Sequence, residues 1–320
     1  MPAIITHDLF GQDVYHELHA SIGETRDEYE AFLLGNQGPD PLFYTVISPS
    51  LREFHQLGST MHNVKPTELI AAFKDSLSVL AEDEAPIGRA YALGFLCHYT
   101  LDSSMHPLVF AQEYAVCDAG VDGLSRDDGH EVHGTIESEF DEMALFTVRH
   151  QTIASFNPSV EILKASDFVL DAISKMYAFV AMTVYGLFIP SDMFATAVRN
   201  FRFIQGLFYS PTGSLRAVIS RVEELVRPYS FYRSMSHRPI EITESQFGNH
   251  ERAVWKNPFT GEESDLGFWE IFADAQEKAK SNIASFASKD FDLEAARRIT
   301  GDLDFSGEPT NATLVVVDDE

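Results

Sequence analysis

Residues 92–107 read ALGFLCHYTLDSSMHP. This stretch places His98, Asp102 and His106 at positions i, i+4 and i+8, a spacing that stacks three side chains along one face of an α-helix. Leucine, phenylalanine and tyrosine fill the positions around them, so we expect the helix to be buried. Burying imidazole and carboxylate groups is unfavourable unless something satisfies them, and a bound cation does so directly. The alternative is a core histidine bonded to a neighbouring aspartate.

A second stretch, residues 130–149, repeats the spacing with His133, Glu137 and Asp141. The repeat predicts a second helix with a polar stripe, and further candidate ligands come from the N-terminal connections. The candidate metal ligands are His7, Asp40, His62, His98, Asp102, His106, His133 and Glu137. Eight ligands exceed what one tetrahedral zinc takes and suit two or three ions close together. Asp102 is the natural bridge between ions, because a histidine lies one helical turn to either side of it.

Several polar residues are alternatives to these candidates. His55 competes with His62, and His130 competes with His133, although only His133 pairs with Glu137 at i+4. Two interpretations of Asp141 are open: it either orients a metal-ligating histidine or is a charge on the surface of the helix. The remaining histidines without partnered spacing are expected on the surface, namely His150, His237 and His250.

The spacing of apolar residues is helical along almost the whole chain, which predicts an all-α fold. We expect one large multi-helix domain over residues 1–300, with a metal cluster between its helices and its ligand-bearing part in residues 1–150. Residues 301–320 are expected to form an acidic, flexible tail, and residues 255–264 an ordered loop. Pro107 is expected to close the ligand helix or begin the next turn. The predicted helices are 8–22, 24–36, 66–83, 86–106, 130–149, 159–187, 191–209, 213–226, 267–285 and 291–299.

Composition restricts the partners. The 320 residues include 49 acidic and 23 basic ones, giving a formal net charge of −26, which disfavours binding to long nucleic acids and to anionic membranes. Two cysteines, Cys97 and Cys117, imply no disulfide framework. The N-terminus lacks the pattern of a signal peptide, and the longest apolar run, residues 178–190, is too short to span a bilayer. We therefore expect a cytoplasmic protein.

Five segments in order resemble the zinc-dependent phospholipase C family, which belongs with the phospholipase C and P1 nuclease group. They are THDLFG at 6–11, FLLGNQGPD at 32–40, LGSTMH at 57–62, LGFLCHYTLDSSMHP at 93–107 and HGTIESEFD at 133–141. The resemblance implies the fold of that group and two or three Zn²⁺ ions. It implies one zinc held by His62, His98, Asp40 and Asp102, a second held by His106, His133 and Glu137, and a third to which His7 and Asp102 contribute. It also implies that Asp40 is the catalytic general base.

The activity that the resemblance implies is hydrolysis of a phosphodiester by metal-activated water. The expected substrate is a phospholipid or a small soluble phosphodiester, and peripheral contact with a membrane surface is compatible with that. Two other functions stay open, a nuclease or nucleotidase on the same metal framework, and a non-catalytic, metal-stabilised helical protein that binds lipid. The sequence leaves the oligomeric state undetermined.

Overall fold

The computed structural model describes residues 3–120, 124–213 and 236–310, and these residues are mostly helical. The all-α prediction is confirmed, with one small antiparallel sheet of two strands within the predicted loop 255–264. The α-helices are α1 (Ile4–Ile22), α2 (Arg26–Gly35), α3 (Leu57–Asn63), α4 (Pro66–Asp75), α5 (Ala85–Cys117), α6 (Gly129–Arg149), α7 (Pro158–Glu161), α8 (Asp167–Tyr185), α9 (Met193–Phe208), α12 (Phe268–Ala287) and α13 (Leu293–Thr300). The short 3₁₀ helices are η1 (Asp40–Ile47), η2 (Pro49–Phe54), η3 (Ser76–Val79) and η4 (Arg126–Asp128), and the strands are β1 (Trp255–Lys256) and β2 (Glu263–Ser264).

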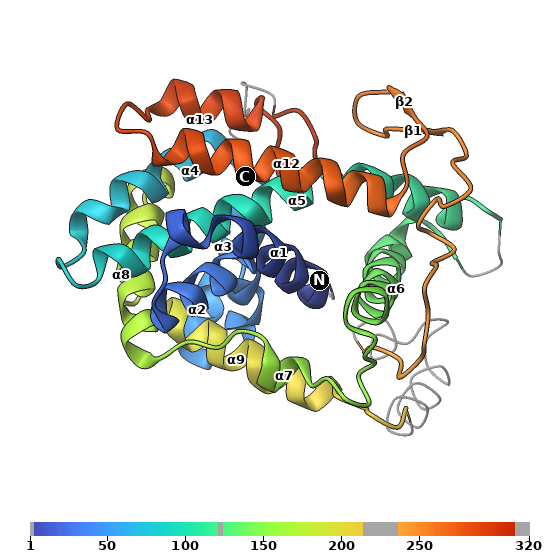
Figure 1. Ribbon diagram of the computed structural model, residues 1–320, viewed down its shortest axis with the longest axis horizontal. Coiled ribbons are helices and arrows are strands. Elements are labelled where there is room, and N and C mark those ends of the chain that lie inside the picture. Colours follow the sequence, from blue (N-terminus) through green and yellow to red (C-terminus); the bar gives the residue numbers. More distant parts are fainter. Residues whose placement is uncertain (1–2, 121–123, 214–235, 311–320) are drawn as a thin grey trace, which may run out of the picture.

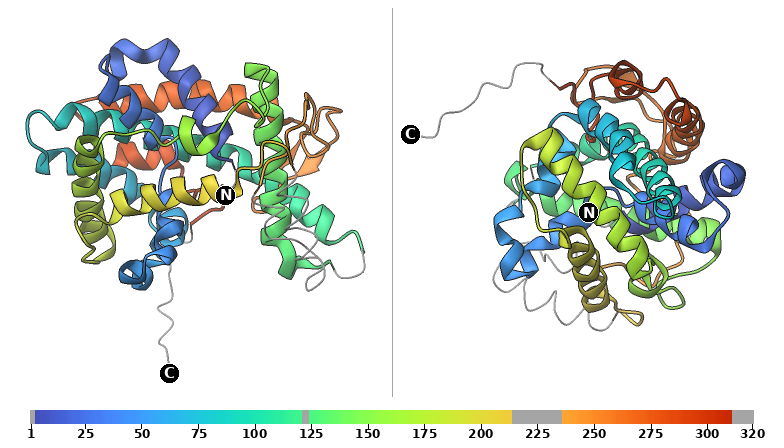
Figure 2. Two further views of the ribbon diagram at one scale, coloured as in Figure 1. Left: turned by 90° about the horizontal axis from the view of Figure 1, so that it is seen from below. Right: turned by 90° about the vertical axis from the view of Figure 1, so that its left-hand side faces the viewer.

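Helix α5 is the central element of the fold. Most of its residues are buried, which is typical of a helix surrounded by others, and it contacts α1, α2, α6, α8 and α12. Figure 1 shows α12 running alongside α5, and Figure 2 shows α6 and α8 at opposite ends of the molecule. The helix continues through Pro107, although an interior proline lacks the N–H for one helical hydrogen bond. Tertiary packing around the buried Pro107 therefore overrides the local preference to end there.

The contact between α2 and α5 brings the turn that follows α2 against α5, the helix that carries His98, Asp102 and His106. Two glycines meet there: a Cβ on Gly94 would lie 2.0 Å from the carbonyl oxygen of Phe32, and one on Gly35 would lie 2.3 Å from that of Tyr91. Only residues without a side chain allow this approach. It places the turn after α2 directly against the buried face of α5.

Helix α8 is the one described helix that is long and apolar enough to cross a membrane, but 56% of its apolar window is buried in the protein. It packs against α4, α5 and α9, as expected for a core helix. The prediction of a single helix over 159–187 is wrong, because the chain leaves the helical conformation between α7 and α8. Ser166 caps the start of α8 by accepting the N–H of Val169, which fixes its first residue. The predicted helix 213–226 lies almost wholly outside the described residues.

Candidate metal centre

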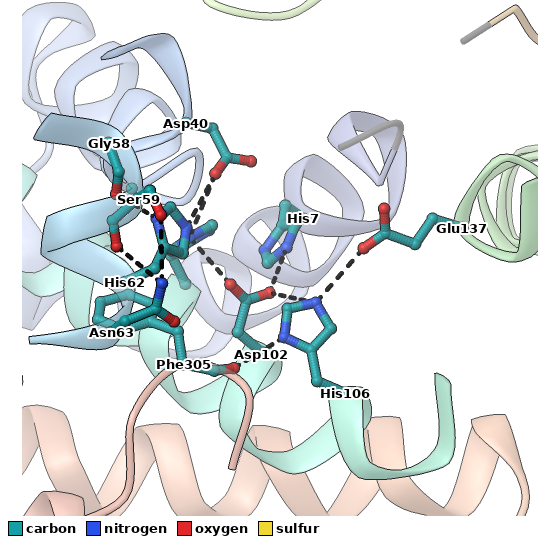
Figure 3. Close-up of polar contacts among 12 residues, drawn as sticks. His7, Asp40, Gly58, Ser59, His62, Asn63, Asp102, His106, Glu137 and Phe305 are labelled. Carbon is teal, nitrogen blue, oxygen red and sulfur yellow. Dashed lines mark hydrogen bonds and ion pairs between the residues drawn. The ribbon is translucent and has the colours of Figure 1, made fainter. Parts of the chain in front are cut away.

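The fold brings all eight candidate ligands to one site. Figure 3 shows His7, Asp40, His62, Asp102, His106 and Glu137 turned toward one another. Helix α5 supplies three of the eight ligands, α6 two, and α1, η1 and α3 one each. The ligands form three groups, and the two that share His98 together make up the inner cluster. The inner cluster consists of His7, Asp40, His62, His98 and Asp102, and the outer cluster consists of His106, His133 and Glu137.

In the inner cluster, imidazole nitrogens face carboxylate oxygens. His62 Nε2 lies 3.1 Å from Asp40 Oδ1, and His98 Nε2 lies 3.2 Å from Asp102 Oδ2. His7 Nε2 lies 3.0 Å from Asp102 Oδ1. The two oxygens of Asp102 thus face different histidines, which is the arrangement expected of a bridging carboxylate.

The outer cluster is built around Glu137. Its Oε1 lies 3.4 Å from His106 Nε2 and 3.3 Å from His133 Nε2. His106 Nε2 also lies 3.8 Å from Asp102 Oδ1, so His106 faces both clusters. The i, i+4 spacing recognised in the sequence therefore does place His133 and Glu137 together.

Four of the histidines are held through Nδ1. The acceptors are Gly58 O for His62 at 2.7 Å, Asn36 O for His98 at 3.1 Å, Phe305 O for His106 at 2.7 Å and Glu113 Oε2 for His133 at 3.0 Å. In a neutral imidazole, an Nδ1–H that donates to oxygen leaves the lone pair on Nε2, and all four Nε2 atoms face the clusters. Metal-binding histidines are oriented by such hydrogen bonds in the same way.

The arrangement fits divalent cations. Two ligand atoms about 2.05 Å from a tetrahedral zinc are roughly 3.3 Å apart, close to the separations between these nitrogens and oxygens. Among the described residues, His98 Nε2 has no hydrogen-bond partner although His98 is fully buried. A bound cation would satisfy this atom, since Asp102 and Asp40 oxygens lie 3.2 and 3.9 Å away.

The histidines and carboxylates of the two clusters shift one another's pKa values. Burial alone lowers the pKa of His106, but Asp102 and Glu137 outweigh burial and raise that pKa to about 9. Burial alone would raise the pKa of Asp102, whereas His98, His106 and His7 hold it well below its usual range. The Asp102 carboxylate thus stays ionised and attracts positive charge.

A cavity of about 340 Å³ opens onto both clusters. Phe43 and Phe110 form aromatic walls, with ring centroids 5.2 Å from that of His62 and 4.9 Å from that of His133, respectively. No lysine or arginine of the described chain lines it. Any anionic group that enters must therefore be neutralised by protonated histidines or by a bound cation.

The structure also decides between the alternatives. His55 is exposed and bonds through Nδ1 to Arg52 O, away from the clusters, whereas His62 lies within them. His130 is exposed at the cavity, and His133 is in the outer cluster. Asp141 is fully buried and orients neighbouring groups, so the surface interpretation is wrong for it.

The sequence analysis missed other residues at the site. It did not select Glu113, Asn36 or Phe305 as partners of histidines, and it assigned Phe305 to a flexible tail. Residues 301–310 instead pack against the site, and 311–320 lie outside the described residues. The expectation that His237 is a surface residue is wrong, because it is buried against Asp141. His150 and His250 are exposed, as expected.

Comparisons of the chain with family models, with curated proteins and with solved structures found no match.

Proposed function

We propose that the protein is a zinc-dependent phosphodiester hydrolase of the phospholipase C type, with the helical architecture of the phospholipase C and P1 nuclease group. One observation carries the proposal: four histidines are fixed through Nδ1 so that Nε2 faces a carboxylate at 3.1–3.4 Å. Ion pairs that only stabilise the fold do not require four histidines whose Nε2 atoms all point into one site. Two or three divalent ions held by these histidines and carboxylates would account for the arrangement.

When bound, such ions would polarise a phosphoryl oxygen and lower the pKa of a water molecule to about 7. The chain's own residues do the rest. Asp40 lines the cavity and is the general base in this proposal, accepting the proton of the attacking water on the oxygen that is not turned toward His62. Phe43 and Phe110, which line the cavity, would shield a bound phosphodiester from bulk water.

The acidic residues that line the cavity imply that an anionic substrate binds only when cations are bound there. Asp40, Asp102, Glu113 and Glu137 all line it, and four carboxylates repel a phosphodiester. We therefore expect substrate affinity, and not only turnover, to vanish when metal is removed.

A nuclease or nucleotidase is the second candidate, favoured by the aromatic walls. The Phe43 and Phe110 rings offer faces on which a nucleobase can stack. The net charge of −26 makes a nucleotide or dinucleotide a better substrate than a long strand.

The test combines metal analysis with a substrate panel. Zinc content is measured in the wild type, in His98→Ala and in His16→Ala, the last being an exposed histidine outside the clusters. The panel contains short-chain phosphatidylcholine, p-nitrophenylphosphorylcholine, bis(p-nitrophenyl) phosphate and a dinucleotide. We expect about two or more zinc ions in the wild type and in His16→Ala, and hydrolysis of at least one phosphodiester that His98→Ala loses. A wild type that binds less than about one zinc per chain would refute the proposal, since the two-metal reaction requires two.

A further inference from the structure

The C-terminal segment, residues 301–310, connects the two clusters through one residue. The backbone N–H of Phe305 donates to His62 O at 3.1 Å, and Phe305 O accepts from His106 Nδ1 at 2.7 Å. His62 belongs to the inner cluster and His106 to the outer one. Figure 3 shows this carbonyl against His106.

The side chain of Phe305 reinforces these contacts. Its ring is fully buried, and its centroid lies 4.9 Å from that of His62 and 5.8 Å from that of His98. It also meets the ring of Tyr99 edge-on at 5.0 Å. Phe305 thus forms part of the floor on which two inner-cluster imidazoles lie.

The segment is folded and anchored independently of these imidazoles. Asp304 Oδ1 accepts the N–H groups of Ser306 and Glu308 at 2.8 and 3.0 Å, which closes a tight loop. Tyr99, on α5, donates its hydroxyl to Leu303 O at 2.9 Å. A preformed loop loses little conformational entropy when it packs against α5, so it can hold a candidate metal-ligating histidine such as His106 firmly in place.

Gly307 makes the docking possible. A Cβ there would lie 2.8 Å from Ser103 O and 2.9 Å from Pro107 Cγ, and the residue has a φ of +75°. Gly301 has a comparable φ of +59°, but a Cβ on it would meet nothing within 4 Å. The chain therefore contains one glycine that the docking requires and one that it does not.

We propose that the C-terminal segment is a component of the metal centre, with Phe305 as a positioning residue for His62 and His106. This inference rests on the proposed metal site. Since the segment orients ligands, its docking and metal binding stabilise each other, and the coupling is reciprocal by thermodynamic necessity. Helices α1 to α6 would then supply the ligands, and a segment about 200 residues further along would complete their orientation.

Gly307→Ala and Gly301→Ala form a matched pair for the test. Zinc affinity is measured by competition with a chromogenic chelator, and the melting temperature of the zinc-free proteins is measured alongside. We expect Gly307→Ala to bind zinc about 10-fold or more weakly, the loss typical of a missing orienting contact, and Gly301→Ala to stay within about 2-fold of the wild type. Equal zinc affinity in Gly307→Ala and the wild type would overturn the inference.

Hydrogen exchange of the wild type provides a second measurement that needs no variant. We expect the Phe305 amide to exchange at least about 10-fold more slowly with saturating zinc than with EDTA, because bound zinc stabilises the docked segment. Exchange that is unchanged by zinc would overturn the inference even if zinc binds. A wild type that binds no zinc at all would overturn both the proposed function and this inference, so the two failures are distinguishable.

Discussion

The carboxylate of Asp141 accepts the backbone N–H of Thr6 at 2.7 Å, across 135 positions of sequence. The same carboxylate accepts the Thr6 hydroxyl at 2.6 Å, the Ile5 N–H at 3.1 Å and His237 Nε2 at 2.8 Å. The first N–H groups of a helix have no partner within the helix, so Asp141 fixes where α1 begins. His7 follows directly, and Asp141 therefore positions His7 in the inner cluster.

Asp141→Asn should weaken this anchor. One carboxylate oxygen becomes an NH₂ group that faces other donors, and we expect a loss of about 2–3 kcal/mol in the free energy of unfolding. The affinity for zinc should fall more at the inner cluster, to which His7 belongs, than at the outer cluster. Denaturant unfolding and a zinc titration measure the two effects. Thr6→Val removes only the hydroxyl contact, and if both variants behave alike, Asp141 does not position His7.

Two tyrosines support the turn that precedes Asp40. Tyr177 donates its hydroxyl to Gly38 O at 3.0 Å, and its oxygen lies 2.7 Å from that of Tyr91. We expect Tyr177→Phe to lose about 1 kcal/mol of stability and, because Asp40 is then held less firmly, to lower kcat for phosphodiester hydrolysis. Tyr15→Phe is the matched control, since Tyr15 donates to Gly23 O at 2.7 Å away from the clusters. Equal kcat values in the two variants would show that the turn needs no such support.

Glu113 orients His133 from outside the outer cluster. The buried carboxylate accepts from His133 Nδ1 at 3.0 Å, and such a partner typically contributes 10- to 100-fold in metal affinity, so we expect Glu113→Gln to lose about that much. Glu131→Gln, a half-buried position on α6, should leave zinc affinity unchanged. Competition with a chelator measures both. Unchanged affinity in Glu113→Gln would mean that the neutral amide orients His133 equally well.

Asp8 should make stability depend on pH. Burial raises its pKa from 3.8 to about 7, although Gln12 donates a hydrogen bond to it. Between these values the unfolded chain has released a proton that the folded protein keeps, so the contribution of Asp8 to stability falls as pH rises and is least favourable above about pH 7.

Asp8→Asn removes this titration. We expect the variant to be more stable than the wild type, with a gain that grows by about 2 kcal/mol between roughly pH 5.5 and pH 8.5. Denaturant unfolding at the two pH values measures the gain. Asp13→Asn, at a half-buried position on the same helix, should show a smaller change, and a gain for Asp8→Asn that is independent of pH would contradict the assignment.

Five of the eight candidate ligands could be selected from the sequence because helical spacing is local, whereas His7, Asp40 and His62 lie on three separate elements, α1, η1 and α3, and share no such spacing. His98, Asp102 and His106 share a face of α5 wherever that helix lies, and the same holds for His133 and Glu137 on α6. The boundaries of α5 and of α7 to α8 were predicted less well. Pro107 favours a helix end, yet its surroundings keep the helix intact. Within residues 159–187, Ser166 followed by Asp167 is an N-cap signal for the start of α8, and the apolar spacing outweighed it in the prediction.

The sequence by itself determined that the chain is helical and which side chains can reach a cation, because periodicity and side-chain chemistry belong to the residues. Only the tertiary structure decided what orients those side chains. Three of the four histidine acceptors, Gly58 O, Asn36 O and Phe305 O, are backbone carbonyls, which every residue has, so no residue type marks them in advance. The contacts of Glu113 with His133 and of Asp141 with Thr6 depend on how helices pack, which local spacing does not specify.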